Sequence, residues 1–305
     1  MTGDDVASLT TPAAPAVVRY RMSANDIPRV GICSDGRVTG LPGAASLAEL
    51  WRLRTAELRE RLAAPNPATA VPLDEVELLA PVDGRTEVWA SGVTYETSRT
   101  ARVEESEKAA DVYELVYDAE RPELFFKSVA WRVRGPGQVV GIREDSSMDV
   151  PEPELALVVN RYGETVGYTV CNDMSSRTIE GENPLYLPQA KIYSGACSVG
   201  PWIVPAWSIP DPYRLGISLT IHRAGRPVWD GSASTSRLHR RLDDLVGYLM
   251  RGDVHPAGVV LSTGTCLVPP APFTLEHGDR VDIGIEGIGT LSNTVRRGVI
   301  EEEAA

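Results

Sequence analysis

The sequence is poor in the residues that build thiolate and imidazole metal sites. It contains four cysteines and four histidines in 305 residues. The cysteines lie far apart, and no Cys-x-x-Cys pair occurs among them. Zinc and iron–sulfur centres are therefore not expected. Dispersed cysteines without a pairing pattern indicate reduced thiols, so we expect a cytoplasmic protein.

Positive charge is also scarce. The chain has 30 Lys and Arg against 42 Asp and Glu, which gives a net charge of −12. No basic stripe is present that would bind nucleic acid or an anionic membrane surface. No apolar run approaches the length of a membrane-spanning helix, and the first residues lack the features of a signal peptide. We expect neither nucleic acid nor a membrane as a partner.

The first part of the chain has the pattern of a small α+β unit. Strand-like segments surround an Asp35-Gly36 hairpin signal. An amphipathic helix is predicted over residues 46–63, capped by Ser46 and Glu49. A Pro-rich connector follows. We predict a small N-terminal domain with its linker over residues 1–72 and a larger domain over residues 73–305.

The larger part consists mainly of short strand-like segments separated by Gly and Pro turns. Helical patterns occur over residues 95–120 and 237–252. The repeated strand–helix alternation of a doubly wound fold is missing. The predicted fold class is therefore α+β, mainly β, with a curved mixed sheet as its core.

Three carboxylates stand out around a predicted hairpin. Glu152 and Glu154 alternate along a strand and therefore project from the same face. A two-residue hairpin loop near Tyr162 would place Asp173 on that face, whereas a three-residue loop would place it on the other. Clustered carboxylates repel one another unless a cation holds them. Oxygen ligands suit Mg²⁺, with Mn²⁺ or Ca²⁺ as alternatives. A solvated acidic strand edge is the other interpretation.

The order of motifs around these carboxylates resembles the fumarylacetoacetate hydrolase family over most of residues 85–299. The segments that carry the resemblance are EPELALVVNRYGETVGYTVCNDMSSR, QAKIYSGACSVGP, GRPVWDGSAST, VVLSTGT and LEHGDRVDIGIEGIGTLSNTV. The resemblance implies a mixed β-sandwich roll, a metal that binds a 2-keto acid, and a homodimer or homotetramer. It also implies that Glu152, Glu154 and Asp173 are the metal ligands and that Thr265 contacts the substrate carboxylate.

The segment GVTYETSRTA departs from the hydrolytic members of that family. These members often carry a His–Glu pair that activates water, but Ser98 and Ala101 stand at those positions here, and Thr94 replaces an asparagine. None of the four histidines lies near this segment in sequence. Without that base, hydrolysis loses its usual route to hydroxide. The segments GVTYETSR, DVYELVYDAERPELFFK and IEGENPLYLPQAKIY instead resemble the branch that dehydrates 2-keto-3-deoxy sugar acids.

The resemblance to this branch implies a metal-dependent hydro-lyase. Its expected reaction converts a 2-keto-3-deoxy pentonate, such as 2-keto-3-deoxy-D-arabinonate, to α-ketoglutaric semialdehyde in non-phosphorylating pentose breakdown. Lys191 is the implied base for the C3 proton, and Glu123 is the implied acid or water-positioning residue. Lys127, Ser98 and Arg99 are the further candidates for substrate binding.

Two alternatives remain open from the sequence. The first is a C–C bond hydrolase of an acylpyruvate or a 2,4-diketo-3-deoxy sugar acid, in which Glu123 would activate the water. The second is a non-catalytic protein that binds a metal or a keto acid.

Overall fold

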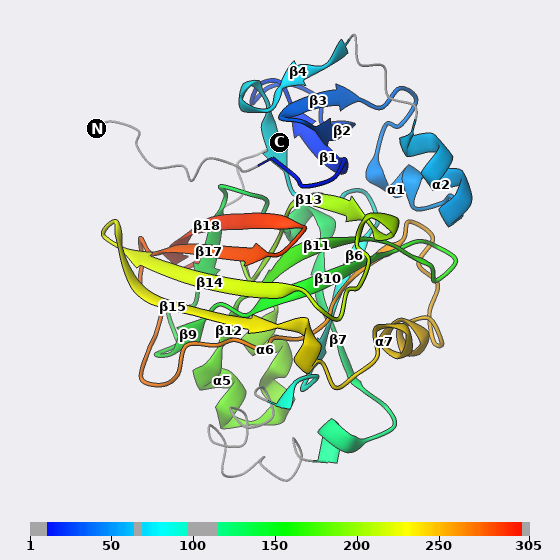
Figure 1. The fold of residues 1–305 in the computed structure, drawn as a ribbon. Helices are drawn as coiled ribbons and strands as arrows, with labels where there is room; N and C mark the ends of the chain where they lie inside the picture. Colours follow the sequence, from blue (N-terminus) through cyan, green and yellow to red (C-terminus); the bar gives the residue numbers. More distant parts are fainter. Residues whose placement is uncertain (1–10, 64–68, 97–114, 301–305) are drawn as a thin grey trace.

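Two large sheets dominate the computed structural model, which describes residues 11–63, 69–96 and 115–300 (Figure 1). The larger sheet is 11-stranded, and β5 (Glu77–Leu79) pairs with β1 outside its main path. Its main path runs in the order β4 (Val71–Pro72), β3 (Arg37–Gly40), β2 (Arg29–Ser34), β1 (Ala16–Arg21), β13 (Cys197–Pro205), β11 (Thr165–Asp173), β10 (Pro153–Val159), β16 (Val259–Ser262), β6 (Glu87–Gly92) and β7 (Glu123–Val129).

The second sheet has five strands in the order β15 (Arg226–Ser234), β14 (Gly216–Arg223), β17 (Arg280–Ile285), β18 (Gly289–Arg297) and β8 (Val139–Ile142). Two short strands, β9 (Asp149–Val150) and β12 (Ser175–Ser176), form a third sheet. The pairs β16–β6 and β18–β8 are parallel, whereas the neighbours β10–β11 and β14–β17 are antiparallel. The prediction of a mainly β fold with a mixed sheet is confirmed.

The helices are short. Those that lie wholly within the described residues are α1 (Leu47–Leu50), α2 (Thr55–Leu62), α5 (Arg177–Glu182), α6 (Leu187–Lys191) and α7 (Leu242–Leu249). Single 3₁₀ turns join several elements: η2 (Leu73–Glu75), η3 (Ala130–Arg132), η4 (Pro184–Tyr186), η5 (Ala206–Ser208) and η6 (Thr235–Arg237). In the described part of the chain, no helix has the length and hydropathy that a membrane crossing requires.

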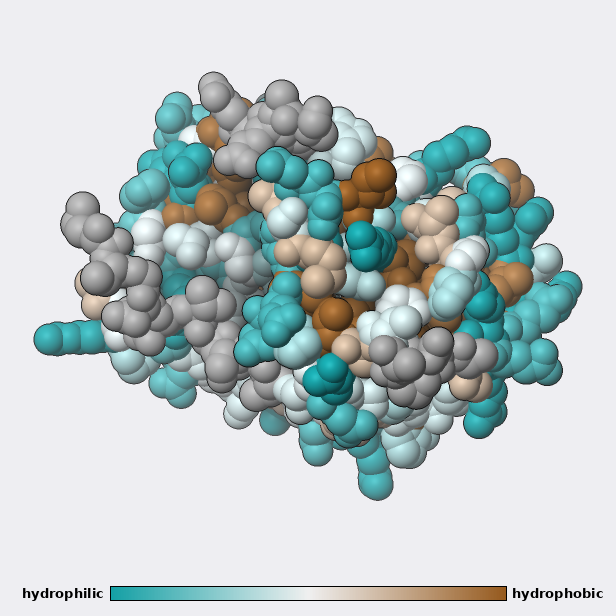
Figure 2. Space-filling model, turned by 90° about the horizontal axis from the view of Figure 1, so that it is seen from above, coloured by the Kyte–Doolittle hydropathy of each residue, from teal (hydrophilic) through white to brown (hydrophobic). Residues whose placement is uncertain are grey.

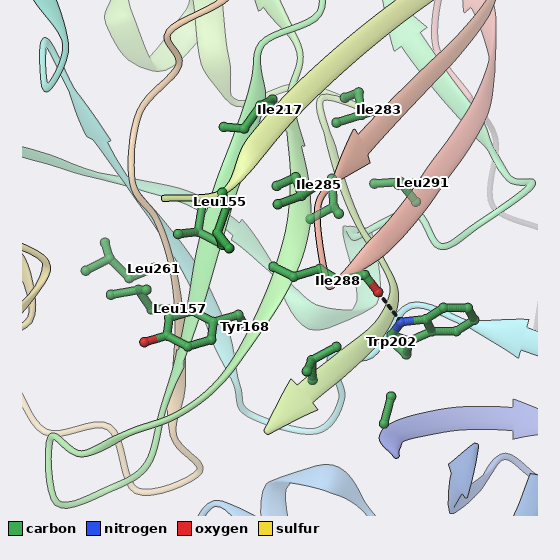
Figure 3. Close-up of a cluster of buried hydrophobic side chains, with 14 of the residues drawn as sticks. Leu155, Leu157, Tyr168, Trp202, Ile217, Leu261, Ile283, Ile285, Ile288 and Leu291 are labelled. Atoms are coloured by element: carbon green, nitrogen blue, oxygen red, sulfur yellow. Dashed lines mark hydrogen bonds between the residues drawn. The ribbon is translucent and has the colours of Figure 1, made fainter. Parts of the chain in front are cut away.

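The main core fills the space between the two large sheets (Figure 3). Leu155 and Leu157 of β10 point into it, together with isoleucines of β14 and β17. The indole Nε1 of Trp202 donates to the Ile288 carbonyl at 2.6 Å, so this large side chain is buried without losing its hydrogen bond. Ala156 and Val158 of β10 belong to a second core on the other face of the same sheet. The even-numbered face of β10, which carries the predicted metal ligand Glu154, therefore looks away from the main core.

The N-terminal region was predicted correctly in its strands but not in its helix. Asp35 and Gly36 form the β2–β3 turn with φ values of 51° and 71°. The single helix predicted over residues 46–63 is two helices, α1 and α2. Trp51 is buried between them, and its carbonyl accepts a hydrogen bond from the Arg161 amide at 2.9 Å instead of continuing the helix. This long-range bond is invisible in the local helical pattern.

The N-terminal strands extend the larger sheet, because β1 pairs with β13. These strands and α1 and α2 lie at one end of the molecule, opposite α5 and α6 (Figure 1). Seen from the N-terminal end, hydrophilic side chains form most of the rim and apolar ones gather nearer the middle (Figure 2). The domain boundary at residue 72 stays a prediction.

One of the two other predicted helices also differs from expectation. The helix predicted over 237–252 is shortened to α7, because Leu238 bridges to Tyr95 and the His239 amide donates to the Thr94 carbonyl. These backbone groups are therefore used in pairing with a distant segment. Most of the pattern at 95–120 lies outside the described residues.

Candidate metal and catalytic site

The β10–β11 hairpin places Asp173 opposite Glu152. The Asp173 amide donates to the Glu152 carbonyl at 3.0 Å, and Glu154 pairs with Cys171. The connection has three residues, since the Asn160 amide closes it on the Glu164 carbonyl. A loop of this length alone would put Asp173 on the wrong face. A β-bulge restores the parity: Val158 pairs with Gly167 and Val159 with Thr165, which leaves Val166 as the extra residue.

The three predicted ligands form one buried cluster. Glu152, Glu154 and Asp173 each offer a carboxylate oxygen, and these oxygens lie within 4.8 Å of one another. The three side chains are 1–2% exposed. A solvated acidic edge is therefore excluded, because these carboxylates are inside the protein. Such a cluster needs compensating positive charge.

Three cationic side chains surround the cluster. The Lys191 Nζ atom lies 2.7 Å from Glu152 Oε2 and 3.1 Å from Asp173 Oδ2, and it also contacts Ser175 Oγ at 2.5 Å. Arg177 Nη2 lies 2.8 Å from Glu152 Oε1. Lys127 pairs with the other oxygen of Asp173. Glu152 and Asp173 are thus both held by cations.

Glu154 has a different environment. Its Oε2 atom accepts hydrogen bonds from the Ser262 hydroxyl at 2.5 Å and from the Gly264 amide at 2.9 Å. Among the described residues, no cation forms an ion pair with Glu154. Burial, followed by the charges of Asp173 and Glu152, raises the pKa of Glu154 well above its ordinary value. This carboxylate is therefore the least compensated of the three.

Local chain features present the cationic residues. Ser176 caps α5 by accepting from the Ile179 amide, and Arg177 is the first residue of that helix. Lys191 is the last residue of α6, and Pro188 lies in the first turn of this helix, where proline is well tolerated. Lys127 occupies a β-bulge in β7, because Ser128 pairs with Val88 while Phe126 pairs with Trp89. Bulges re-aim side chains and often occur next to active sites.

Lys127 uses its ammonium group entirely inside the protein. It is 1% exposed and donates to the carbonyls of Met174 and Lys191 at 3.1 Å and 2.5 Å, besides its ion pair with Asp173. An ammonium has three N–H groups, so three contacts occupy all of them. Lys127, which was predicted to bind substrate, thus connects Asp173 to the backbone of the segment that carries Lys191.

Glu123 lies on the same strand, at the edge of the site. It pairs with Gly92, and a Cβ atom on Gly92 would lie 2.0 Å from Glu123 Oε2. The carboxylate therefore packs directly over the Gly92 backbone. Phe125, two residues further along, has its ring centroid 5.8 Å from Lys191 Nζ. Alternation along β7 gives Glu123 and Phe125 the same side, toward Lys191.

The Thr263–Thr265 loop follows β16 and closes over Glu154. Besides the Gly264 amide bond, the Thr265 hydroxyl contacts the Pro153 carbonyl at 3.1 Å. Thr94, which replaces the asparagine of the hydrolytic motif, is fully buried and donates to the Thr263 carbonyl at 2.6 Å. The structure therefore places Thr265 beside Pro153, between the candidate ligands Glu152 and Glu154 in sequence.

Ser98 and Arg99 lie outside the described residues, and so does Ala101. The fold does bring one histidine next to Thr94, because the His239 amide donates to the Thr94 carbonyl. The His239 ring stacks on the Tyr117 ring with a centroid separation of 4.2 Å. Its Nε2 atom lies 3.8 Å from Asp118 Oδ1. Sequence separation concealed this neighbour.

Sequence reasoning missed Arg177, Ser175 and Ser262 as members of the site. Each lies within or beside a quoted motif, but burial of an arginine or a serine cannot be read from the sequence. The rarity of lysine in the sequence was one signal that Lys127 and Lys191 have a special role. The chain contains only three, Lys108, Lys127 and Lys191, so two of the three are buried here.

The donor set fits a hard divalent cation. All three candidate ligands are carboxylates, which suits Mg²⁺, Mn²⁺ or Ca²⁺ better than softer metals. The Lys191 ammonium already sits between Glu152 and Asp173, which shows that the cluster attracts positive charge. A metal ion would compete with this ammonium for the same two carboxylates.

Two curated dehydratases are similar to this chain. The chain is 55% identical over 215 residues to the probable 2-keto-3-deoxyxylonate dehydratase of Haloferax volcanii. The matched segment covers 70% of this chain and 73% of that protein. It is 42% identical over 228 residues to the 2-dehydro-3-deoxy-D-arabinonate dehydratase of Saccharolobus solfataricus, with coverages of 74% and 76%.

Solved structures agree with the fold. A 2-keto-3-deoxy-D-arabinonate dehydratase complexed with magnesium and 2,5-dioxopentanoate superposes with a TM-score of 0.80 at 34% identity, covering 93% of this chain and 99% of that one. A fumarylacetoacetate hydrolase from Exiguobacterium antarcticum shares the fold with a TM-score of 0.71 at 23% identity, over 93% and 100% of the two chains. The family model described as fumarylacetoacetate (FAA) hydrolase C-terminal matches residues 87–296. The chain therefore belongs to the fumarylacetoacetate hydrolase family.

Proposed function

We propose that this protein is a Mg²⁺-dependent dehydratase that converts a 2-keto-3-deoxy pentonate, such as 2-keto-3-deoxy-D-arabinonate, to α-ketoglutaric semialdehyde. This product is 2,5-dioxopentanoate, the compound named in the related magnesium complex. The observation that carries the proposal is the meeting of a buried amine with three clustered carboxylates: Lys191 Nζ lies 2.7 Å from Glu152 Oε2. Base and metal ligands thus share one site.

The proposed chemistry begins with proton removal at C3. When bound, Mg²⁺ supplies Lewis acidity that polarises the C2 ketone and makes the C3 proton more acidic. Lys191, as the neutral amine, takes this proton. Glu123, as the protonated acid, gives a proton to the C4 hydroxyl, which leaves as water while the C3–C4 double bond forms. Transfer of a proton from C5 to C3 then gives the C4–C5 enol. Transfer of the enol proton from oxygen to C4 gives the C5 aldehyde, so the net change is loss of one water.

The remaining predicted residues take the following proposed roles. Thr265, Ser98 and Arg99 bind the substrate, which for Thr265 is supported by the position of its loop over Glu154. Glu152, Glu154 and Asp173 hold the metal. For Lys127 we infer a positioning role instead of substrate contact, because its three N–H groups are already used.

The test is direct conversion. Purified protein with Mg²⁺ and 2-keto-3-deoxy-D-arabinonate should produce 2,5-dioxopentanoate, detected by NMR, and chelation with EDTA should abolish the product. Formation of pyruvate from an acylpyruvate, with the keto-deoxy acid untouched, would instead identify a C–C hydrolase. No turnover of either class with intact metal binding would favour a non-catalytic keto-acid binding protein.

Replacement of Lys191 distinguishes the role of a catalytic base from the role of a metal ligand. Lys191→Ala should retain Mg²⁺ binding and lower kcat by about a thousandfold, because general base catalysis contributes on that order. Glu152→Gln is the matched comparison: it should weaken Mg²⁺ binding itself, measured by calorimetry. An unchanged kcat in Lys191→Ala would show that another group removes the proton.

We further propose that the protein acts in the cytoplasm on a small 2-keto acid and assembles as a homodimer or homotetramer. Exposed apolar side chains such as Trp131 (65% exposed) and Leu185 (83%) are of the kind that subunit contacts cover. Sedimentation velocity over a range of concentrations would measure the oligomeric state.

A further inference from the structure

Two neutral donors hold the Glu154 carboxylate. They are Ser262, the last residue of β16, and Gly264 in the loop that follows. Ser262 is fully buried, and its hydroxyl donates to Glu154 Oε2 at 2.5 Å. The Gly264 amide donates to the same oxygen at 2.9 Å. One oxygen of the carboxylate is therefore fixed by the protein.

The position of the Gly264 amide depends in turn on Thr94. The Thr94 hydroxyl donates to the Thr263 carbonyl at 2.6 Å across a sequence separation of 169 residues. Gly264 has φ +91°, and a Cβ atom on it would lie 2.0 Å from Thr94 Oγ1. The loop and Thr94 are thus in direct contact, with no room for a side chain between them.

The other side of the loop is attached to the strand that carries Glu154. The amide and the hydroxyl of Thr263 both bond to the Leu155 carbonyl, at 3.0 Å and 2.8 Å. Thr94 and Leu155 therefore hold the loop from two directions. A donor fixed in this way does not have to reorganise when the ligand beside it binds a metal.

We propose that Ser262 and Thr94 are positioning residues for the metal ligand Glu154. Ser262 orients the carboxylate directly, and Thr94 acts through the Gly264 amide by holding the loop. The inference rests on the proposed metal-dependent function, because it concerns a metal ligand of that site. It gives Thr94 a role in metal binding at the position where hydrolytic relatives carry the asparagine of their water-activating motif.

The test measures metal affinity without substrate. Ser262→Ala should bind Mg²⁺ about tenfold more weakly than wild type in isothermal titration, since loss of such a partner to a ligand typically weakens metal binding by about 10- to 100-fold. Thr94→Val keeps the shape of the side chain, removes the hydroxyl and should weaken binding in the same direction. The control is Ser198→Ala, whose buried hydroxyl donates to the Arg134 carbonyl at 2.9 Å, and it should retain wild-type affinity.

The outcomes separate this inference from the proposed function. If both Ser262→Ala and Thr94→Val bind Mg²⁺ within twofold of wild type, the positioning role is wrong while the metal site stands. If wild-type protein itself does not bind Mg²⁺, the proposed function fails with it. Equal weakening in Ser198→Ala would show a general effect of buried hydroxyl loss and would also overturn the inference. Thermal melts confirm folding, and Thr94→Val alone still tests the proposal if Ser262→Ala does not fold.

Discussion

At the scale of single residues, lysine is used sparingly and at the site. The sequence has three lysines and 30 − 3 = 27 arginines. Lys127 and Lys191 are each 1% exposed and meet at Asp173. An amine can donate three hydrogen bonds from one atom and can lose its proton, whereas guanidinium stays charged and needs planar partners. The chemistry of this site explains why lysine and not arginine occupies these two positions.

Lys127→Met should separate a positioning role from substrate binding. Removal of the ammonium frees the Lys191 carbonyl and one side of Asp173, so kcat should fall by about 10- to 100-fold while KM changes by less than about threefold. Steady-state kinetics at saturating Mg²⁺ measure both constants. A KM raised tenfold or more with kcat preserved would return Lys127 to the role of a substrate ligand.

At the scale of elements, two β-bulges determine which side chains enter the site. In the β10–β11 hairpin, the three-residue loop and the bulge at Val166 each reverse the alternation, and together they restore it. In β7, the bulge aims Lys127 at Asp173. The sequence left the face of Asp173 dependent on the length of the loop, because nothing in the residue pattern reveals a bulge that cancels the effect of a three-residue loop.

Gly264→Ala tests how tightly the Thr263–Thr265 loop is packed. Alanine adds strain at φ +91° and a Cβ atom 2.0 Å from Thr94 Oγ1. We expect a loss of about 2–4 kcal/mol in the free energy of unfolding and weaker Mg²⁺ binding. Gly225→Ala is the matched control, since φ is +75° there but nothing lies within 4 Å of the added Cβ.

Chemical denaturation compares the two glycine variants. Gly225→Ala should lose only the part of the free energy of unfolding that comes from backbone strain, about 1–2 kcal/mol, and should keep its Mg²⁺ affinity. Equal losses of stability and unchanged metal binding in both variants would mean that the loop has room to move.

At the scale of the whole molecule, the site is assembled from segments that are distant in sequence. Strands β7, β10, β11 and β16 bring their ends together, and α5 and α6 add Arg177 and Lys191. The buried charges of this site belong to the folded state only. Any cation that binds there stabilises the folded protein by mass action, so chelation should lower the unfolding temperature.

The affinity for Mg²⁺ should depend on pH through Glu154. Its raised pKa means that the carboxylate holds a proton at pH values where an exposed glutamate is already ionised. Proton and metal compete for this group, so affinity should increase as pH rises and each binding event should release protons until Glu154 is ionised in the metal-free protein. Calorimetry in two buffers with different heats of ionisation measures the release. Constant affinity and no proton release below neutral pH would contradict the assigned environment of Glu154.

Local patterns were sufficient for the fold class and the family, and they singled out the three carboxylates that cluster in the structure. Strand alternation, turn residues and the ordered motifs depend on neighbours in sequence, and these are preserved in the structure. The division of the N-terminal helix at Trp51, the shortened α7, the two bulges and the burial of Arg177 depend on long-range contacts, so only the tertiary structure revealed them. The same holds for the contacts of Lys127, Ser262 and Thr94, because a hydrogen bond between residues more than 60 positions apart leaves no local signal.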